Sequence, residues 1–300
     1  NYVGTSAIGE DAIPNLTGGV RLASTDGVSV GQSSGNLISG NDAPGIVVDS
    51  STNGMIVNNI VGLDVDGDTA MPNIAYGINI FGSSFFTVTN NTISANTGSG
   101  MRLADGSTAI NIYDNRIGVG AFSNIDLGNT NHGIYVDNSF DNTIGNVSSS
   151  LGNLIAFNDS RGIYVLNTDD VNYNSYGNTI VGNSIFSNGN LGIDLAPAGP
   201  TANDTDDADD GPNHLQNFIT FTAKQTVAGV QITGQLNTDP ARPNYRIEFF
   251  TNNTCDGSGY GEGASMVDVL DVTITAATTA IDYEIPNTSI EVGEFITCLL

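Results

Sequence analysis

The sequence contains no tryptophan, one lysine (Lys224) and few basic residues of any kind. Lys and Arg together number 7 against 32 Asp and Glu, which gives a formal net charge of −25. Binding to nucleic acid needs a basic surface that neutralises phosphates, so this balance excludes nucleic acid as a partner. Acidic polysaccharides are repelled as well, unless a divalent cation bridges the two.

Long apolar runs and helical patterns are also missing. No apolar stretch approaches 18 residues, so no membrane span is predicted. No segment of ten or more residues repeats its apolar positions every 3.6 residues, which predicts very little α-helix. Hydrophobic residues still make up 39% of the chain, enough for a core, and 37 residues are glycine. The sequence therefore predicts an all-β protein.

A short pattern of glycine, aliphatic, any residue, aliphatic occurs seven times. Its glycines lie 26, 32, 23, 33, 29 and 30 residues apart. The copies are Gly19–Leu22, Gly45–Val48, Gly77–Ile80, Gly100–Leu103, Gly133–Val136, Gly162–Val165 and Gly192–Leu195. Repetition at this period marks a solenoid, and alternating apolar residues indicate a strand with one buried face. Such strands pair with their own copies, which predicts a right-handed parallel β-helix of about seven coils.

Asn-x-Ile segments lie between these strands, for example at Asn36, Asn91 and Asn153. Asparagine suits bends, and stacked amides bond to the copies above and below in parallel in-register stacks. A longer element precedes every second glycine-led strand, starting at Asn1, Asn59 and Asn115, and predicts a protruding turn on alternate coils. The ends of such a rod need caps, because one repeat cannot bury its apolar face alone.

The repeats stop after Leu195, so we expect the β-helix to cover residues 1–195. Residues 196–217 form a connector rich in Pro, Gly and Asp. Residues 218–300 carry turn signals between longer strands and predict a small antiparallel Ig-like β-sandwich that lacks its closing seventh strand. The expected strands are Phe218–Gln225, Val227–Asn237, Tyr245–Thr251, Met266–Thr275, Ala280–Ile285 and Glu294–Leu300.

These features resemble exported right-handed β-helix repeat proteins that carry a C-terminal β-sandwich. Their repeats are similar to Asn1-Tyr-Val-Gly-Thr5, and many end in a segment similar to Gly211-Pro-Asn-His-Leu-Gln-Asn-Phe218 followed by Tyr245–Phe250. The resemblance implies the fold over nearly the whole chain. It implies little about activity, and it suggests an extracellular or cell-surface protein. The chain opens at Asn1 within a repeat, which predicts a mature or trimmed product of a longer precursor.

Five aspartates crowd into the connector, at Asp204, Asp206, Asp207, Asp209 and Asp210. Carboxylates held together in a turn repel one another, and a hard cation removes that repulsion. Calcium takes six to eight oxygen ligands from such groups, so the segment predicts a structural calcium site that stiffens the joint. Asn203 or Asn213 could add an oxygen. The alternative is a solvated acidic linker.

The exposed positions of the glycine-led strands should stack in one file about 4.8 Å apart. Arg102, Tyr135, Tyr164 and Asp194 then become neighbours, with His132, Asp137 and Arg161 beside them. Stacked tyrosines next to arginine are a candidate glycan-binding face. The alternative is that tyrosine simply packs well on strands.

No catalytic set emerges from the sequence. Asp49 and Asp137 follow strands of the second and fifth coils, about 14 Å apart by strand spacing, which is too far for a carboxylate pair. His132 precedes a glycine-led strand and His214 lies in the connector, so no Ser-His-Asp set can be assembled. If the protein were an enzyme, a polysaccharide lyase or glycoside hydrolase would be the expected class.

The two cysteines, Cys255 and Cys298, both lie in the sandwich segment. In an acidic, exported chain a disulfide is favoured over a metal site, so we expect a disulfide that staples the sandwich. Taken together, the sequence favours an extracellular structural or adhesive protein within a larger surface assembly or filament. Its partners would be other copies of itself or neighbouring surface proteins. The alternative is a polysaccharide-binding or polysaccharide-degrading protein that uses the Arg102–Tyr135–Tyr164 face.

Overall fold

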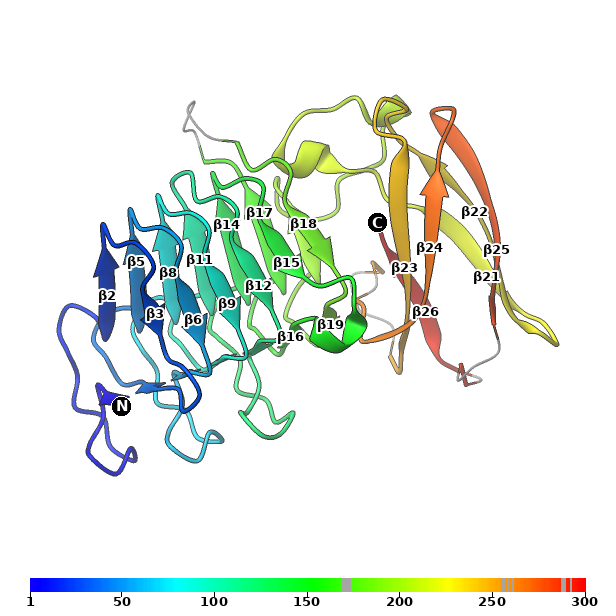
Figure 1. Cartoon of the computed structure of the whole chain (residues 1–300). Coiled ribbons are helices and arrows are strands. Elements are labelled where there is room, and N and C mark those ends of the chain that lie inside the picture. Colours follow the sequence, from blue (N-terminus) through cyan, green and yellow to red (C-terminus); the bar gives the residue numbers. More distant parts are fainter. Residues whose placement is uncertain (169–173, 255–256, 258, 261, 287–289, 292) are drawn as a thin grey trace.

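The chain is a right-handed parallel β-helix repeat protein followed by a small antiparallel β domain (Figure 1). The structure is a computed structural model, and it describes residues 1–168, 174–254, 257, 259, 260, 262–286, 290, 291 and 293–300. Three parallel sheets run along the β-helix, two with seven strands and one with six. Each strand pairs with its own copy one coil away, which confirms the coil predicted from the repeats.

Each coil contributes one strand to each sheet, except that the last coil has no strand in the third sheet within the described residues. The glycine-led sheet contains β2 (Val20–Ala23), β5 (Ile46–Asp49), β8 (Ile78–Phe81), β11 (Met101–Ala104), β14 (Ile134–Asp137), β17 (Ile163–Leu166) and β20 (Ile193–Leu195). The asparagine sheet contains β1 (Tyr2–Val3), β4 (Leu37–Ile38), β7 (Ile60–Val61), β10 (Thr92–Ile93), β13 (Arg116–Ile117), β16 (Leu154–Ala156) and β19 (Ser184–Phe186). The third sheet contains β3 (Ser29–Val30), β6 (Met55–Val57), β9 (Thr87–Thr89), β12 (Asn111–Tyr113), β15 (Thr143–Gly145) and β18 (Thr179–Val181).

Aliphatic side chains of the three sheets form one continuous core inside the coil. The leading glycines allow this core to close. A Cβ added at Gly77 would lie 2.6 Å from Ile93 Cγ2 and 2.7 Å from the carbonyl oxygen of Gly100. Any larger residue would therefore push apart two packed coils, which explains why glycine recurs at this position.

Two ladders of asparagines, buried except at their first members, hold the coils in register. In each ladder an amide Nδ2 donates to the Oδ1 of the next coil over 2.7–3.0 Å. The first ladder runs through Asn36, Asn59, Asn91, Asn115, Asn153 and Asn183. The second runs through Asn15, Asn41, Asn73, Asn96, Asn129, Asn158 and Asn188. Each of these Nδ2 groups donates to the next coil toward the C-terminal end. The last coil therefore needs an acceptor from outside the ladder.

Protruding turns occur on alternate coils, as the longer repeats predicted. Each is closed by an antiparallel bridge, namely Thr5 with Ala12, Leu63 with Ala70, and Val119 with Asp126. The three turns hang below the asparagine sheet in Figure 1.

The connector carries two short 3₁₀ turns, η2 (Thr205–Asp207) and η3 (Pro212–Leu215); a third, η1 (Ser149–Leu151), lies in the β-helix. Two three-stranded antiparallel sheets follow, ordered β21-β22-β25 and β24-β23-β26. Their strands are β21 (Thr220–Gln225), β22 (Gly229–Asn237), β23 (Asn244–Asn252), β24 (Ser265–Thr273), β25 (Thr278–Pro286) and β26 (Phe295–Leu299). Every bound lies within two residues of the strand expected from the sequence.

The sandwich caps the open end of the β-helix. Ile185 of β19 bridges antiparallel to Gly263. The Glu262 carboxylate accepts hydrogen bonds from the Ser187 backbone N–H and from both the backbone N–H and the Nδ2 of Asn188. Glu248 accepts the N–H of Gly182 at 2.8 Å. A carboxylate only accepts hydrogen bonds when ionised, so it suits a ladder that ends in donors.

The predicted staple between Cys255 and Cys298 stays a prediction, because Cys255 lies outside the described residues. Cys298 lies on β26, where burial raises the pKa of its thiol to about 12. Within the described ranges, we find no helix of the length and apolarity that crossing a bilayer requires.

Candidate functional site

The outer positions of the glycine-led sheet form a single file along the β-helix. The strand registers pair Arg21 with Val47, Val47 with Asn79, Asn79 with Arg102, Arg102 with Tyr135, Tyr135 with Tyr164, and Tyr164 with Asp194. The polar and aromatic members gather toward the C-terminal coils. This arrangement places a row of half-buried side chains on one face of the rod.

Three rings on this face lie together, with His132 and Tyr164 each stacked on Tyr135 and tilted by 45° to one another. The Tyr135 and Tyr164 centroids lie 6.1 Å apart, and their planes are 26° apart. His132 lies 5.5 Å from Tyr135 and 5.0 Å from Tyr164. The Arg161 guanidinium lies 4.4 Å from the Tyr164 centroid, and that of Arg102 lies between Tyr76 and Tyr135 at 5.7 and 5.9 Å. We call Tyr76, Arg102, His132, Tyr135, Arg161 and Tyr164 the aromatic strip.

Both arginines of the aromatic strip are paired with buried carboxylates. Arg102 Nη2 lies 3.3 Å from Asp137 Oδ2, and Arg161 Nε lies 2.5 Å from Asp194 Oδ2. Each pair fixes a guanidinium against a tyrosine ring and neutralises its charge. The strip thus presents donors and acceptors without net charge.

Burial favours the uncharged forms of His132, Tyr135 and Tyr164. Burial, with the Arg161 charge second, lowers the pKa of His132 to about 4. Burial, followed by the Asp137 carboxylate, raises the pKa of Tyr135 to about 12, and burial also raises the pKa of Tyr164. Nδ1 of His132 accepts the backbone N–H of Arg161 at 3.3 Å, which a neutral imidazole permits.

The low pKa of His132 predicts a stability that depends on pH. Between its ordinary pKa of 6.5 and about 4, the unfolded chain takes up a proton that the folded protein does not. The free energy of unfolding should therefore fall as the pH is lowered through this window. In His132→Asn the amide oxygen can still accept the Arg161 N–H, but nothing titrates. Thermal melts at decreasing pH should show a smaller loss of stability for His132→Asn than for wild type. Equal losses in the two proteins would contradict the low pKa of His132.

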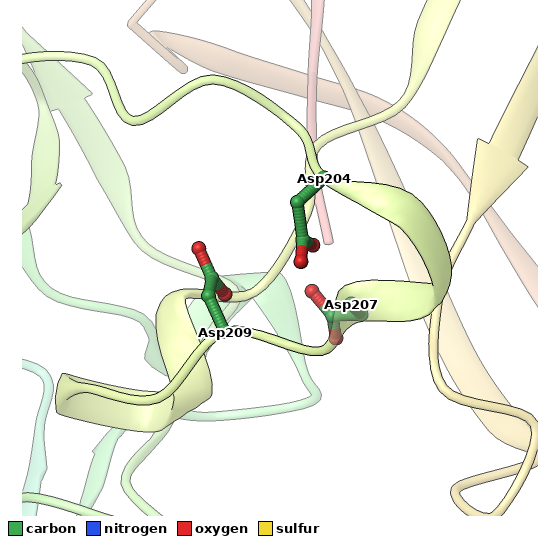
Figure 2. A group of neighbouring side chains, drawn as sticks. All are labelled: Asp204, Asp207 and Asp209. Carbon is green, nitrogen blue, oxygen red and sulfur yellow. The ribbon is translucent and has the colours of Figure 1, made fainter.

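A second candidate site lies in the connector, where Asp204, Asp207 and Asp209 come together (Figure 2). One carboxylate oxygen from each lies within 4.8 Å of the other two. Asp207 is 6% exposed. Its Oδ1 accepts the N–H of Asn217 at 2.7 Å, whereas its Oδ2 is buried without a hydrogen-bond partner among the described residues. Burial raises the pKa values of Asp207 and Asp209, and the neighbouring carboxylates add to both shifts.

The other predicted ligands lie apart from this group. Asp206 is exposed and is not part of this group. Asp210 instead accepts the Tyr176 hydroxyl and lies 4.0 Å from His214. The side-chain oxygens of Asn203 and Asn213 accept the backbone N–H groups of Phe218 and Asn178. The structure therefore brings three of the five aspartates together.

Sequence reasoning missed one residue of the aromatic strip and the two glutamates that cap the β-helix. Tyr76 directly precedes the marker glycine Gly77, just as His132 and Arg161 precede Gly133 and Gly162, so the repeat alignment held a signal for it. The capping residues Glu248 and Glu262 had no such signal, because they lie outside the repeats.

Comparison with known families gives one match. Residues 15–120, about a third of the chain, match the family described as "Periplasmic copper-binding protein (NosD)". A comparison with curated proteins found no match.

Solved structures with similarity include two crystal structures of mutants of the periplasmic alginate epimerase AlgG. They are 20% and 21% identical, with TM-scores of 0.37 and 0.39, and cover 58% of this chain and 45% and 44% of theirs. Tailspike protein 2 from an Escherichia coli bacteriophage is 10% identical with a TM-score of 0.32, covering 99% of this chain and 47% of its own. The chain thus spans less than half the length of each of these structures.

Proposed function

We propose that the protein is an exported β-helix protein that binds an uncharged polysaccharide along the aromatic strip. The observation that carries this proposal is the stack of Tyr135, Tyr164 and His132, flanked by two arginines held in place by buried carboxylates. The export part is supported by the partial match to a family described as periplasmic.

The chemistry of the strip suits a sugar chain. Aromatic faces offer apolar area to the C–H faces of sugar rings, while phenol, imidazole and guanidinium groups exchange hydrogen bonds with hydroxyls. The strip also follows successive coils, and strands about 4.8 Å apart repeat the contacts along the rod. A linear polymer lying along the rod can meet several of these groups at once.

The charge balance argues for an uncharged polymer. Arg102 and Arg161 are each neutralised by an aspartate, so neither is free to pair with a uronate carboxylate. The net charge of −25 repels acidic chains as well. We therefore expect the protein to bind alginate, the polysaccharide that the name of the AlgG structures mentions, more weakly than an uncharged polysaccharide.

Titration of the full chain with neutral and acidic polysaccharides tests this proposal. Tyr164→Ala should weaken binding of a neutral polysaccharide about fivefold, since a ring contact contributes on the order of 1 kcal/mol. Tyr164→Phe keeps the ring and should bind more tightly than Tyr164→Ala. Tyr113→Ala, on the third sheet, is the matched control and should bind like wild type. Equal affinities of Tyr164→Ala and Tyr113→Ala, or a preference for alginate, would refute the assignment.

The second candidate is a structural or adhesive role in a surface assembly. It is favoured by β26, whose outer edge has no partner strand in the described part of the chain. A cavity of about 980 Å³ beside this edge is lined in part by Leu191, Phe218 and Phe295. A strand from a second copy could add here by β-augmentation. Absence of glycan binding together with self-association in light scattering would favour this role.

Copper binding is not part of the proposal, although the matched family is described as copper-binding. Residues 15–120 contain no His or Cys. Met71 and Met101 in this range are buried, and Met55 is 42% exposed. Copper prefers imidazole, thiolate and thioether ligands, and a single exposed thioether does not make a site.

A further inference from the structure

We propose that Asp204, Asp207 and Asp209 bind one calcium ion, which locks the connector onto the sandwich. This site is separate from the aromatic strip, and it stands or falls independently of the proposed glycan binding. The argument begins with the group itself, in which three carboxylates of one short segment face a common space (Figure 2).

The burial of Asp207 is the observation that points to a ligand. Its side chain is turned into the group at 6% exposure, and its Oδ2 has no hydrogen-bond partner in the described part of the chain. Oδ1 of Asp209 is likewise buried and unpaired. Leaving a buried carboxylate oxygen unpaired is strongly unfavourable, so such atoms are rare unless something else binds them.

The surrounding charges increase this penalty. Asp239 adds a further negative charge near Asp207, and the basic neighbour Arg242 is already paired with Asp239 at 3.6 Å. The segment thus lacks the positive charge that its carboxylates need. A divalent cation would supply that charge.

The geometry fits calcium. Calcium binds oxygens at 2.3–2.6 Å, so two of its ligands can lie up to about 5 Å apart. The three carboxylate oxygens lie within 4.8 Å of one another, so small side-chain movements bring them onto one such ion. Water can complete its six to eight positions. Magnesium binds at about 2.1 Å in a stricter octahedron and should bind more weakly here.

The bound ion would join the connector to the sandwich through Asn217. The Asn217 backbone N–H donates to Asp207, and its Nδ2 donates to the carbonyl oxygens of Asp204 and Asn237. Asn237 ends β22 of the sandwich. Fixing the aspartates therefore fixes the turn that links the connector to that sheet.

Calorimetric titration and thermal melting of the chelator-treated full chain test the proposal with calcium and magnesium chloride at matched ionic strength. We expect one calcium per chain, at least tenfold tighter than magnesium, and a melting temperature several degrees higher with calcium, because the ion binds only the folded state. No binding and an unchanged melting temperature would overturn the proposal. Equal affinity for magnesium would overturn the assignment to calcium.

Two asparagine variants sharpen the test. Asp207→Asn keeps the oxygen that accepts the Asn217 N–H but removes a ligand charge, so calcium affinity should fall at least tenfold. In chelator the same variant should melt at or above wild type, because a buried repulsion is gone. Asp206→Asn, in the same turn but outside the group, should respond to calcium like wild type. Identical calcium responses of Asp207→Asn and Asp206→Asn would overturn the site.

Discussion

Asn91→Ala should lower the free energy of unfolding by about 3–5 kcal/mol, because each buried polar group left unpaired costs about 1–3 kcal/mol. The Asn91 side chain accepts the backbone N–H and the Nδ2 of Asn59 and donates to the Ile56 and Thr89 carbonyl oxygens and to Asn115 Oδ1. Alanine leaves the Asn59 backbone N–H without this acceptor in the middle of the rod. Urea denaturation followed by circular dichroism measures the effect.

Asn111→Ala provides the matched control for this experiment. Asn111 lies on β12 of the adjacent coil, is exposed, and has no side-chain hydrogen bond with another described residue. Its replacement should change the free energy of unfolding by no more than about 0.5 kcal/mol. Similar losses of unfolding free energy in Asn91→Ala and Asn111→Ala would mean that the hydrogen bonds of the ladder contribute little to stability.

Glu262→Ala should uncap the last coil and destabilise it by about 3 kcal/mol or more, since hydrogen bonds to a charged group contribute about 1.5–3 kcal/mol each. Three N–H groups, two of them from Asn188, lose their acceptor. The effect should be local. Hydrogen exchange at the Ser187 and Asn188 amides should accelerate strongly, while exchange in the early coils should stay unchanged.

Two further variants distinguish the loss of the capping hydrogen bonds from the loss of a negative charge. Glu10→Ala removes the same charge from an exposed turn at the other end of the rod and should leave exchange in the last coil unaltered. Glu262→Gln retains one acceptor oxygen and places an amide donor against another N–H, so its effect should be intermediate. Unchanged exchange at Asn188 in Glu262→Ala would show that the sandwich does not cap the coil through this residue.

The repeats made the β-helix predictable. Each glycine-led strand and each Asn-x-Ile bend recurs, so a position such as Asn91 is specified by its copies at Asn36 and Asn153 as well as by its own neighbours. The sandwich strands were predictable from turn residues and β-branched runs. The contact of Glu262 with Asn188 was not, because it joins residues 74 apart through a single non-repeating pair.

The candidate sites were less predictable than the fold. The file of Arg102, Tyr135 and Tyr164 follows directly from strand register, and it could be assembled before any coordinates. Which aspartates of the acidic connector come together could not be predicted in this way. Asp206 and Asp207 are adjacent and both have a positive φ, yet only Asp207 is buried in the group, and no repeat or spacing in the connector distinguishes them.

The one-way direction of the asparagine amides has a consequence for how such rods change in length. Every coil offers donors forward and acceptors backward, so an additional coil inserted between two others meets matching groups on both sides. Only the final coil meets a carboxylate instead. Insertion or loss of whole coils thus leaves the terminating contact intact, and rod length can vary while the C-terminal domain stays the same.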